Sequence, residues 1–295
     1  MRLQTKPSQL QRGFSLVELA TVLAVLTVCA SIAAPAMYQS RDASRRNQCK
    51  NNLKQFGIAL HNYHEAHASF PPGWTNHTAH PGAKARFGWA SSVLPFMDYV
   101  ELYQSLDFNG HRISNVKQFD VYLPAHRCPS DTSPDTNPLR GGFGTSNYSG
   151  SFGPATPPRL LPSGMSANWP GESATPLRTN GIFWMNSNCR IHYITDGSTN
   201  TIMVGERAFT SGAAIWMGVR GNHLENDQVT DTAPGHEINS GYAAFSSRHD
   251  GGAHFLFGDG SVRYISEKIE SGSDQKPGVF QNLSHRADGK VLGEF

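Results

Sequence analysis

Histidine is the residue type in this chain with the clearest potential for metal or acid–base chemistry, because the sequence contains 13 of them. In the stretch HNYHEAH, His61, His64 and His67 follow one another at three-residue spacing, so two of them can share a helix face and bind a metal. The zinc-protease pattern H-E-x-x-H is absent, since only Ala66 separates Glu65 from His67. We therefore interpret these histidines as solvated side chains near a helix end.

A second group of titratable residues lies near the C-terminus, in the stretch HDGGAHFLFGDG. His249, His254 and Asp259 can be drawn as a metal-binding or acid–base trio. The surrounding pattern instead predicts a β-hairpin, in which Asp259-Gly260 supplies the positive φ angles of a tight turn. We interpret Asp259 as a turn residue and His249 as a side chain that packs or hydrogen-bonds in a loop. The two arms and the turn are expected at 255–257, 262–265 and 258–261.

The remaining chemical motifs are weak or absent. TDGSTN at 195–200 offers oxygen atoms of the kind that Ca²⁺ prefers, but the EF-hand spacing is missing. The glycine-rich GGFGTSNYSG at 141–150 has no preceding strand or following helix that would make it a phosphate cradle. We find no nucleophile elbow, P-loop or dinucleotide fingerprint. The sequence therefore predicts a protein that is not an enzyme, without a cofactor or bound metal, Ca²⁺ being the one ion with any support.

A carboxylate inside an apolar segment is the most unusual feature of the chain. Segment 14–38 is long enough to cross a bilayer as a helix, and Glu18 is its one charged side chain. A charge deep in hydrocarbon costs about 2.5–3.5 kcal/mol on insertion scales, so such residues usually have a function and a partner. The alternative is that Glu18 lies one turn into the helix and reaches the head groups.

The residues at the start of the chain resemble the basic end of a secretory signal peptide. Arg2, Lys6 and Arg12 precede the apolar segment. The Ala33-Ala34-Pro35 sequence that follows is a poor version of a signal peptidase site. The small residue in an unusual place is Gly13, immediately before the apolar segment.

The stretch RGFSLVEL resembles the signature of type IV prepilins and type II secretion pseudopilins. The resemblance implies that a prepilin peptidase cuts between Gly13 and Phe14, and that Phe14 becomes an N-methylated N-terminus. Arg12 and Glu18 are then recognised during processing and assembly. Glu18 becomes the fifth residue of the mature chain, where pilins pair this glutamate with the terminal amine of a neighbouring subunit. Such a pair would neutralise the carboxylate inside the membrane.

A cluster of basic residues follows the apolar segment. This flank of the apolar segment carries five basic residues and the N-terminal flank carries three, so the positive-inside rule does not set the orientation. We follow the resemblance in placing the C-terminal part outside the cytoplasm. We interpret the cluster as a solvated helix face, with contact to anionic lipid or an acidic partner as the alternative. The five residues are Arg41, Arg45, Arg46, Lys50 and Lys54.

An apolar stripe predicts that the helix continues beyond the membrane to about Glu65. The stripe repeats at spacings of three and four residues, which is typical of an amphipathic helix. Pro35 fits the proline that often kinks pilin helices, and FPPG at 70–73 ends the helix. The stripe consists of Cys49, Leu53, Phe56, Leu60 and Tyr63.

The rest of the chain predicts a β-rich globular domain. Strands are expected in GIFWMN, TIMVGERAF and AAIWMGVR, and one or two short helices at 91–106. Nine of the 18 prolines lie between Pro129 and Pro176, so we expect surface loops there. The predicted class is α+β, with a long N-terminal helix on a mainly antiparallel sheet. Its parts are a leader at 1–13, a transmembrane half-helix at 14–38, an amphipathic stem at 39–66, and a globular domain at 67–295 with a loop-rich insert at about 129–180.

A second resemblance covers the globular domain. His249, nine further residues and then Asp259-Gly260 are similar to the H-x9-DG segment, here 249–260, of a large family of bacterial pseudopilin-like proteins whose activity is not defined. Four other stretches agree with this family in order. They are CKNNLKQFGIALHNYHEAHASFPPG at 49–73, RCPSD at 127–131, TSNYSG at 145–150 and ITDGSTNTIMVGE at 194–206.

The four cysteines divide between the apolar segment and the globular domain. Cys29 lies in the apolar segment and is expected to pack as a small side chain. Cys49, Cys128 and Cys189 are expected outside the cytoplasm, where disulfides persist, and three pairings are open. Following the resemblance, we expect Cys49–Cys128, because both lie in family-like stretches and their bond would tie the helix to the globular domain.

These observations predict a structural subunit of a type II secretion pseudopilus or a type IV pilus-like fibre. The protein is expected in the bacterial inner membrane as a single-pass chain with a periplasmic C-terminal domain. Expected partners are the prepilin peptidase, the Sec translocon, other pilin or pseudopilin subunits and membrane lipid. A formal net charge of +2 gives no indication of nucleic acid binding. The alternative function is a membrane-tethered ligand-binding or enzymatic domain that uses the pilin-type leader only as an anchor.

Overall fold

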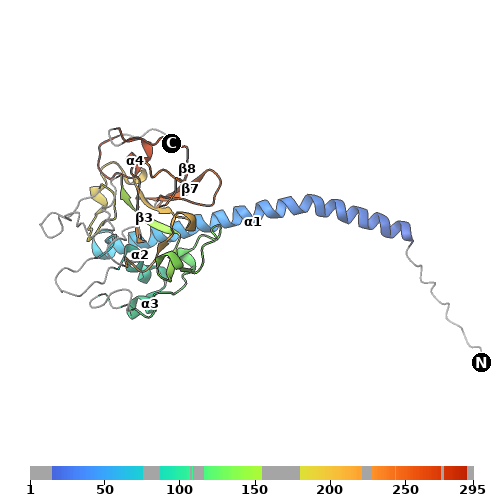
Figure 1. Cartoon of the computed structure of the whole chain (residues 1–295), viewed down its shortest axis with the longest axis horizontal. Helices are drawn as coiled ribbons and strands as arrows, with labels where there is room; N and C mark the ends of the chain where they lie inside the picture. Colours follow the sequence, from blue (N-terminus) through green and yellow to red (C-terminus); the bar gives the residue numbers. More distant parts are fainter. Residues whose placement is uncertain are drawn as a thin grey trace, which may run out of the picture. The chain divides into compact units, whose positions relative to one another are not determined.

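The computed structural model describes residues 15–75, 87–106, 108, 116–154, 180–220, 227–242, 244–273 and 276–290. The chain divides into two compact units, Met1–Ser44 and Arg45–Phe295. Helix α1 (Leu16–His67) contributes its first part to one unit and its last part to the other. In Figure 1 the chain is coloured from α1 in blue to α4 in red.

The described part of the first unit is mainly the N-terminal, apolar part of α1. Among the described residues, α1 is the one helix long and apolar enough to cross a membrane, judged by length and composition. None of the described side chains in its most apolar part is buried. At its start the backbone N–H of Ser15 donates to the Glu18 carboxylate over 2.9 Å, which satisfies one of the free amides of the first turn. Leu16, Val17, Leu19, Val22 and Leu23 are among its exposed apolar side chains.

The second part of α1, residues 45–67, is the central element of the globular unit. Its predicted apolar stripe is fully inaccessible at Cys49, Leu53, Phe56 and Leu60 and partly buried at Tyr63. The helix ends at His67, where Ala68 takes a left-handed conformation with φ 56° and two prolines follow. This part of the helix therefore packs into the globular domain along the face that its periodicity indicates.

The globular unit also contains several short helices. Residues 91–106 form short helical turns, as the sequence predicts, and a further helix closes the C-terminal region. The α-helices are α2 (Trp89–Ser92), α3 (Val100–Ser105) and α4 (Val279–Leu283). The 3-10 turns are η1 (Leu94–Met97), η3 (Pro124–His126), η4 (Pro138–Arg140), η5 (Ile191–Tyr193), η6 (Ser198–Asn200) and η7 (Phe209–Ser211).

The main sheet has five strands in the order β6-β3-β4-β7-β8. All its pairings are antiparallel except β3 with β6, which is parallel. The predicted hairpin is confirmed as β7 and β8, which lie side by side in Figure 1 with Leu256 opposite Val262 and Gly260 at φ 79° in the turn. The strands are β3 (Tyr148–Gly153), β4 (Ile202–Glu206), β6 (Val229–Asp231), β7 (Gly252–Phe257) and β8 (Val262–Ser266).

A second sheet has three short antiparallel strands in the order β1-β2-β5. With the long helix α1 and the mainly antiparallel main sheet, it makes the chain an α+β protein, as predicted. The strands are β1 (Thr136–Asn137), β2 (Phe143–Ser146) and β5 (Ala214–Ile215).

Two expectations about the strands and loops were wrong, and a third is confirmed only in part. GIFWMN forms no strand; Met185 makes a single bridge with Trp74, and the buried side chain of Phe183 packs against Trp89 in an irregular segment. AAIWMGVR is a strand only at Ala214–Ile215. An apolar aromatic run has the same composition whether it fills the core as a strand or as irregular backbone, so periodicity does not separate the two.

The supposed surface loops at 129–180 contain two core strands, β2 and β3, whose residues are all buried. Their composition is rich in Gly and Ser because neighbouring groups approach closely. A Cβ at Gly150 would lie 2.8 Å from the Phe183 ring, so a larger residue has no room there. Residues 155–179 of this predicted insert lie outside the described residues.

Candidate functional site

The residues predicted to direct processing lie at the start of the chain. Arg12, Gly13 and Phe14 are outside the described residues, so cleavage after Gly13 and methylation of Phe14 stay predictions. Glu18 is described and lies in the first turn of α1 with an exposed side chain. Its carboxylate accepts the Ser15 amide and therefore points toward the N-terminal end of the helix.

The residues of the H-x9-DG segment separate into two locations. Asp259 and Gly260 lie in the turn between β7 and β8, where Asp259 accepts a hydrogen bond from the Ser261 amide over 2.8 Å. Partial burial would raise the pKa of Asp259, but its hydrogen bonds with Ser261 and the backbone and the charge of Arg263 together outweigh burial and lower the pKa below its ordinary value. The Gly260 carbonyl accepts from Lys54 Nζ of α1 over 2.9 Å. The turn therefore contacts the stem helix, at a place separate from His249.

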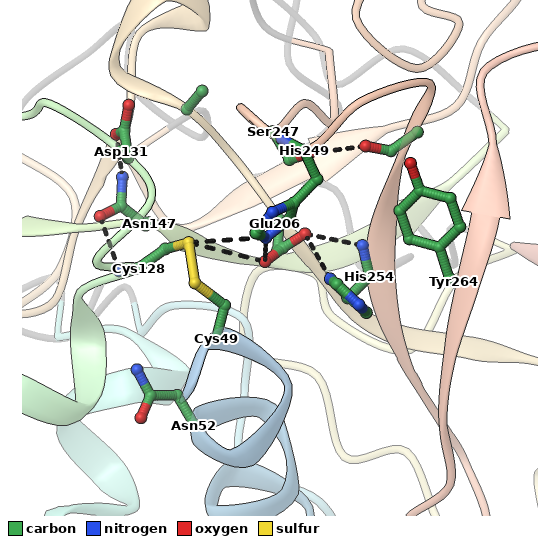
Figure 2. Close-up of polar contacts among 12 residues, drawn as sticks. Cys49, Asn52, Cys128, Asp131, Asn147, Glu206, Ser247, His249, His254 and Tyr264 are labelled. Carbon is green, nitrogen blue, oxygen red and sulfur yellow. Dashed lines mark hydrogen bonds and ion pairs between the residues drawn. A yellow bond between two sulfur atoms is a disulfide. The ribbon is translucent and has the colours of Figure 1, made fainter. Parts of the chain in front are cut away.

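His249 lies just before β7 and contacts Glu206, the last residue of β4 (Figure 2). His249 Nε2 is 3.1 Å from Glu206 Oε1. The second carboxylate oxygen, Oε2, is 2.7 Å from the backbone N of His254 and 3.2 Å from its Nδ1. All three residues are buried, with exposed fractions of 5%, 1% and 6% for His249, Glu206 and His254.

These contacts determine the charge on Glu206. Burial raises the pKa of its carboxyl group, but the hydrogen bonds and charges of His249 and His254 together outweigh burial and lower the pKa below its ordinary value. Glu206 is therefore ionised at neutral pH, although it is enclosed by protein. Such a carboxylate depends on both of its histidine partners.

A disulfide between Cys49 and Cys128 lies beside this cluster (Figure 2). It joins α1 to the segment after η3, over a sequence separation of 79 residues. Cys128 Sγ is 3.8 Å from Glu206 Oε1 and 3.8 Å from His249 Nε2. Cys189 is a buried free thiol, and burial raises its pKa to about 11.

Two asparagines connect the disulfide to the neighbouring elements. Asn52 on α1 donates to the Arg127 carbonyl over 2.7 Å and to the Tyr148 hydroxyl over 3.2 Å. Asn147 Oδ1 accepts from the Cys128 amide over 3.1 Å, and its Nδ2 donates to Asp131. Both asparagine side chains are buried, which limits the competition from water for these hydrogen bonds.

The cluster unites the stretches on which the family resemblance was based. Segments 49–73, 127–131, 145–150 and 194–206 and the start of 249–260 each supply a residue to it, although they are far apart in the chain. Glu206, which none of the sequence hypotheses named as a site residue, is the centre of the contacts. The sequence offered one indication of this role: in TIMVGERAF, Glu206 is a single carboxylate beside an apolar run, as Glu18 is in its own segment.

The three histidines of HNYHEAH, considered above as metal ligands, have separate partners. His64 Nε2 accepts from the Ile191 amide over 3.2 Å, and partial burial lowers the pKa of His64. The His61 ring lies 5.7 Å from Phe70, and the His67 ring lies 4.2 Å from Tyr63. These histidines therefore serve as packing and hydrogen-bonding groups near the end of α1.

Asp196, in the oxygen-rich stretch TDGSTN, lies near the C-terminal segment. Its carboxylate accepts from the amides of Asp288 and Gly289, and its Oδ2 is 3.8 Å from His285 Nδ1. Asp196, His285 and Asp288 are close enough to be considered as metal ligands, but the Asp196 oxygens already accept backbone amides. We assign this carboxylate to holding the C-terminal segment in place.

Comparison with known protein families finds two matches. The model of the prokaryotic N-terminal methylation motif matches residues 9–34, and the model of the protein of unknown function DUF1559 matches residues 39–272, well over half of the chain. No curated protein and no solved structure matches the chain. The methylation motif and the long apolar helix support a prepilin-like, processed and membrane-anchored protein, and the motif implies a prepilin peptidase and pilin-like subunits as partners. The chain therefore belongs to DUF1559, a family of type IV pilin-like proteins of unknown function.

Proposed function

We propose that this protein is a structural subunit that is cut after Gly13, N-methylated on Phe14 and assembled into a type II secretion pseudopilus or a type IV pilus-like fibre. One observation carries the proposal: the methylation motif at residues 9–34 overlaps the apolar segment 14–38, in which Glu18 is the one acidic side chain. Such an assembly pairs the positive N-terminal ammonium of one processed subunit with the negative Glu18 carboxylate of another.

The position of Glu18 supports this pairing. Its carboxylate points toward the N-terminal end of α1, where cleavage would create a new ammonium group. An unpaired carboxylate at this depth costs about 2.5–3.5 kcal/mol in a membrane, and a cation at a similar depth offsets that cost. In a fibre, the ammonium of a neighbouring subunit would provide this cation.

Two features of the globular unit support an extracytoplasmic, structural role. The Cys49–Cys128 disulfide suits an oxidising compartment, such as the periplasm reached after Sec-dependent insertion into the inner membrane. The carboxylate and imidazoles of the Glu206 cluster are buried and bonded to one another. Groups enclosed in this way stabilise a fold more readily than they reach a substrate, so the proposal assigns no reaction to them.

Substitution of Glu18 tests the assembly step. Glu18→Gln keeps the size of the side chain but removes its charge, and the matched control Glu65→Gln removes an exposed charge from the stem of α1. In the native host, Glu18→Gln should abolish recovery of sheared surface or periplasmic fibres, while Glu65→Gln should not. Cleavage, read from the mass of the membrane-bound chain, should persist in both variants. Normal fibre yield from Glu18→Gln would contradict the proposed pairing.

A further inference from the structure

The disulfide and the Glu206 cluster share a feature that their structural role does not require. Cys49, Cys128, Glu206 and His249 each offer one potential metal-ligand atom, and these four atoms all lie within 4.8 Å of one another. All four residues are buried. Sulfur, nitrogen and oxygen donors of this kind are the usual ligands of Zn²⁺ in proteins.

The separations of three of the donors match a tetrahedral zinc site. Bonds of about 2.0–2.3 Å from a tetrahedral Zn²⁺ place neighbouring donors roughly 3.3–3.8 Å apart. Cys128 Sγ lies 3.8 Å from both Glu206 Oε1 and His249 Nε2. His249 Nε2 lies 3.1 Å from Glu206 Oε1. These three donors therefore need only small shifts to surround one ion.

The two sulfur donors, Cys49 and Cys128, become available only when the disulfide opens. In a disulfide neither sulfur is a thiolate, and the thiolate is the form that binds metal. Reduction gives Cys49 and Cys128 two thiols on adjacent elements, and loss of their protons creates two sulfur ligands. Together with Glu206 and His249 they form a set of two cysteines, one histidine and one glutamate.

The surroundings hold these donors in place. The Glu206 Oε2 atom is held by the backbone N–H and the Nδ1 of His254, which leaves Oε1 to face Cys128 and His249. The Cys128 amide is held by Asn147. Outer contacts of this type orient metal ligands, and their loss typically weakens metal affinity 10–100-fold.

A small cavity gives an ion room to approach. Its volume is about 10 Å³, close to the space of one water molecule, and its lining includes Cys128, Glu206, Asp131 and Arg207. Two thiolates and one carboxylate would place three negative charges around a dication, and the nearby Arg207 offsets the remaining negative charge.

We propose that the reduced form of this protein binds one Zn²⁺ through Cys49, Cys128, Glu206 and His249, and that the disulfide and the metal are alternative ways of fastening α1 to the globular domain. A dithiol reductant supplies two electrons and two protons to the disulfide and becomes a disulfide itself. Zn²⁺ then displaces the two thiol protons and the Nε2 proton that His249 shares with Glu206, and these protons pass to solvent. The site would be filled before the disulfide first forms or after its reduction, and it does not depend on fibre assembly.

The test uses the full chain in detergent, with Co²⁺ as the probe because tetrahedral Co²⁺ with thiolate ligands has visible and near-ultraviolet bands. The chain is reduced with a water-soluble phosphine, which becomes the phosphine oxide, and is desalted without oxygen. The reduced chain should bind about one Co²⁺ with sulfur-to-cobalt bands, and Zn²⁺ should displace it. The oxidised chain should bind Co²⁺ at least about 100-fold more weakly, because the two sulfur ligands are absent.

Matched variants identify the ligands. Cys128→Ser should remove much of the sulfur-to-cobalt band, whereas Cys189→Ser, at the other buried cysteine, should leave it unchanged. His249→Ala should change the tetrahedral visible bands, whereas His67→Ala, at an exposed histidine, should not. His254→Gln should weaken Co²⁺ binding about 10–100-fold without changing the type of spectrum, as expected for a residue that positions Glu206.

Comparison of the oxidised and reduced native chain requires no substitution and so avoids variants that fail to fold. Tryptophan fluorescence reports whether the reduced chain keeps its tertiary structure or regains it with Co²⁺. The proposal is wrong if the reduced chain binds no Co²⁺, if its bands survive Cys128→Ser, or if it unfolds and the metal does not restore the fold.

Discussion

His249 Nε2 lies 3.1 Å from Glu206 Oε1, although 43 residues separate the two in the sequence. The contact links the segment before β7 to the end of β4, and the same carboxylate also holds His254 at the start of β7. His249, the first residue of the H-x9-DG segment, is therefore bonded to Glu206, a residue outside that segment. Its last two residues form the hairpin turn that contacts α1 at Lys54.

Removal of the Glu206 carboxylate should destabilise the fold strongly. Glu206→Ala leaves two buried imidazoles and the His254 amide without their acceptor, which should cost about 3 kcal/mol of unfolding free energy. Urea unfolding of the full chain in detergent measures this change. Glu101→Ala, at an exposed position, should stay within about 0.5 kcal/mol of the native chain. Equal effects from the two substitutions would show that the cluster contributes little.

The same carboxylate should make stability depend on pH in the acid range. The pKa of Glu206 is lower in the folded than in the unfolded chain, so its contribution is complete above its ordinary pKa of 4.5 and is lost as pH falls below that value. The Glu206→Gln side chain cannot take up a proton, so the unfolding free energy of this variant should fall less steeply than that of the native chain as pH decreases below 5. The measurement is the unfolding free energy of both chains across this range. Parallel curves would contradict the assigned ionisation.

A buried histidine should cause a second pH dependence. His126 is fully buried against Phe56, its ring nitrogens have no hydrogen-bond partner among the described residues, and burial lowers its pKa to about 3. The unfolded chain gains this proton near pH 6.5, so folding loses stability as pH falls from 6.5 toward 3. Between pH 8 and pH 5 the loss should be about 2 kcal/mol.

His126→Phe fills a similar volume without a titrating group, so it should remove this part of the pH dependence. Unfolding curves at pH 8 and pH 5 give the two values, and His67→Phe serves as the control at an exposed histidine. If His126→Phe loses as much stability between the two pH values as the native chain, the imidazole is not held neutral in the core.

The disulfide should contribute several kcal/mol through the loop that it closes. A separation of 79 residues between Cys49 and Cys128 corresponds to about 4.5 kcal/mol of stabilisation, because the crosslink lowers the conformational entropy of the unfolded chain. In metal-free buffer, reduction should lower the thermal unfolding midpoint of the native chain and of Cys189→Ser alike. The double variant Cys49→Ala/Cys128→Ala should already have the lower midpoint and should not respond to the reductant.

Close packing of α1 on the hairpin should exclude a side chain at Gly57. A Cβ there would lie 2.9 Å from Leu256 Cδ1 and 3.5 Å from Gly260 Cα, so Gly57→Leu forces the two elements apart. The expected loss is about 1–3 kcal/mol of unfolding free energy. Ile58→Ala is the neighbouring control, because the Ile58 side chain is 63% exposed. A neutral Gly57→Leu would show that the helix and the hairpin are not in contact.

Features with a short repeat were predictable from the sequence. The stem stripe at Cys49, Leu53, Phe56 and Leu60 follows the helical period, and the hairpin around Gly260 follows a strand period with a turn signal. Both are local patterns that depend on residues close in the chain. The resemblance of RGFSLVEL to the prepilin signature also depends only on residues that are close together in the chain.

The contacts at the centre of the fold were not predictable in this way. The pairing of His249 with Glu206 depends on the order of β4 and β7 in the sheet, which no local pattern records. The Gly- and Ser-rich composition of β3 suggested a loop, but at Gly150 it reflects the close approach of Phe183. In both cases tertiary packing determines what the residue does.

The central claim is that this chain is processed as a prepilin, and the identity of its N-terminal residue tests it most directly. Mass spectrometry of the terminal peptide, from protein recovered from its native membrane, should find N-methylated Phe14, with Glu18 as the fifth residue. An intact Met1, or a new terminus near Ala34, would show an ordinary anchor or a secreted protein and would contradict the account.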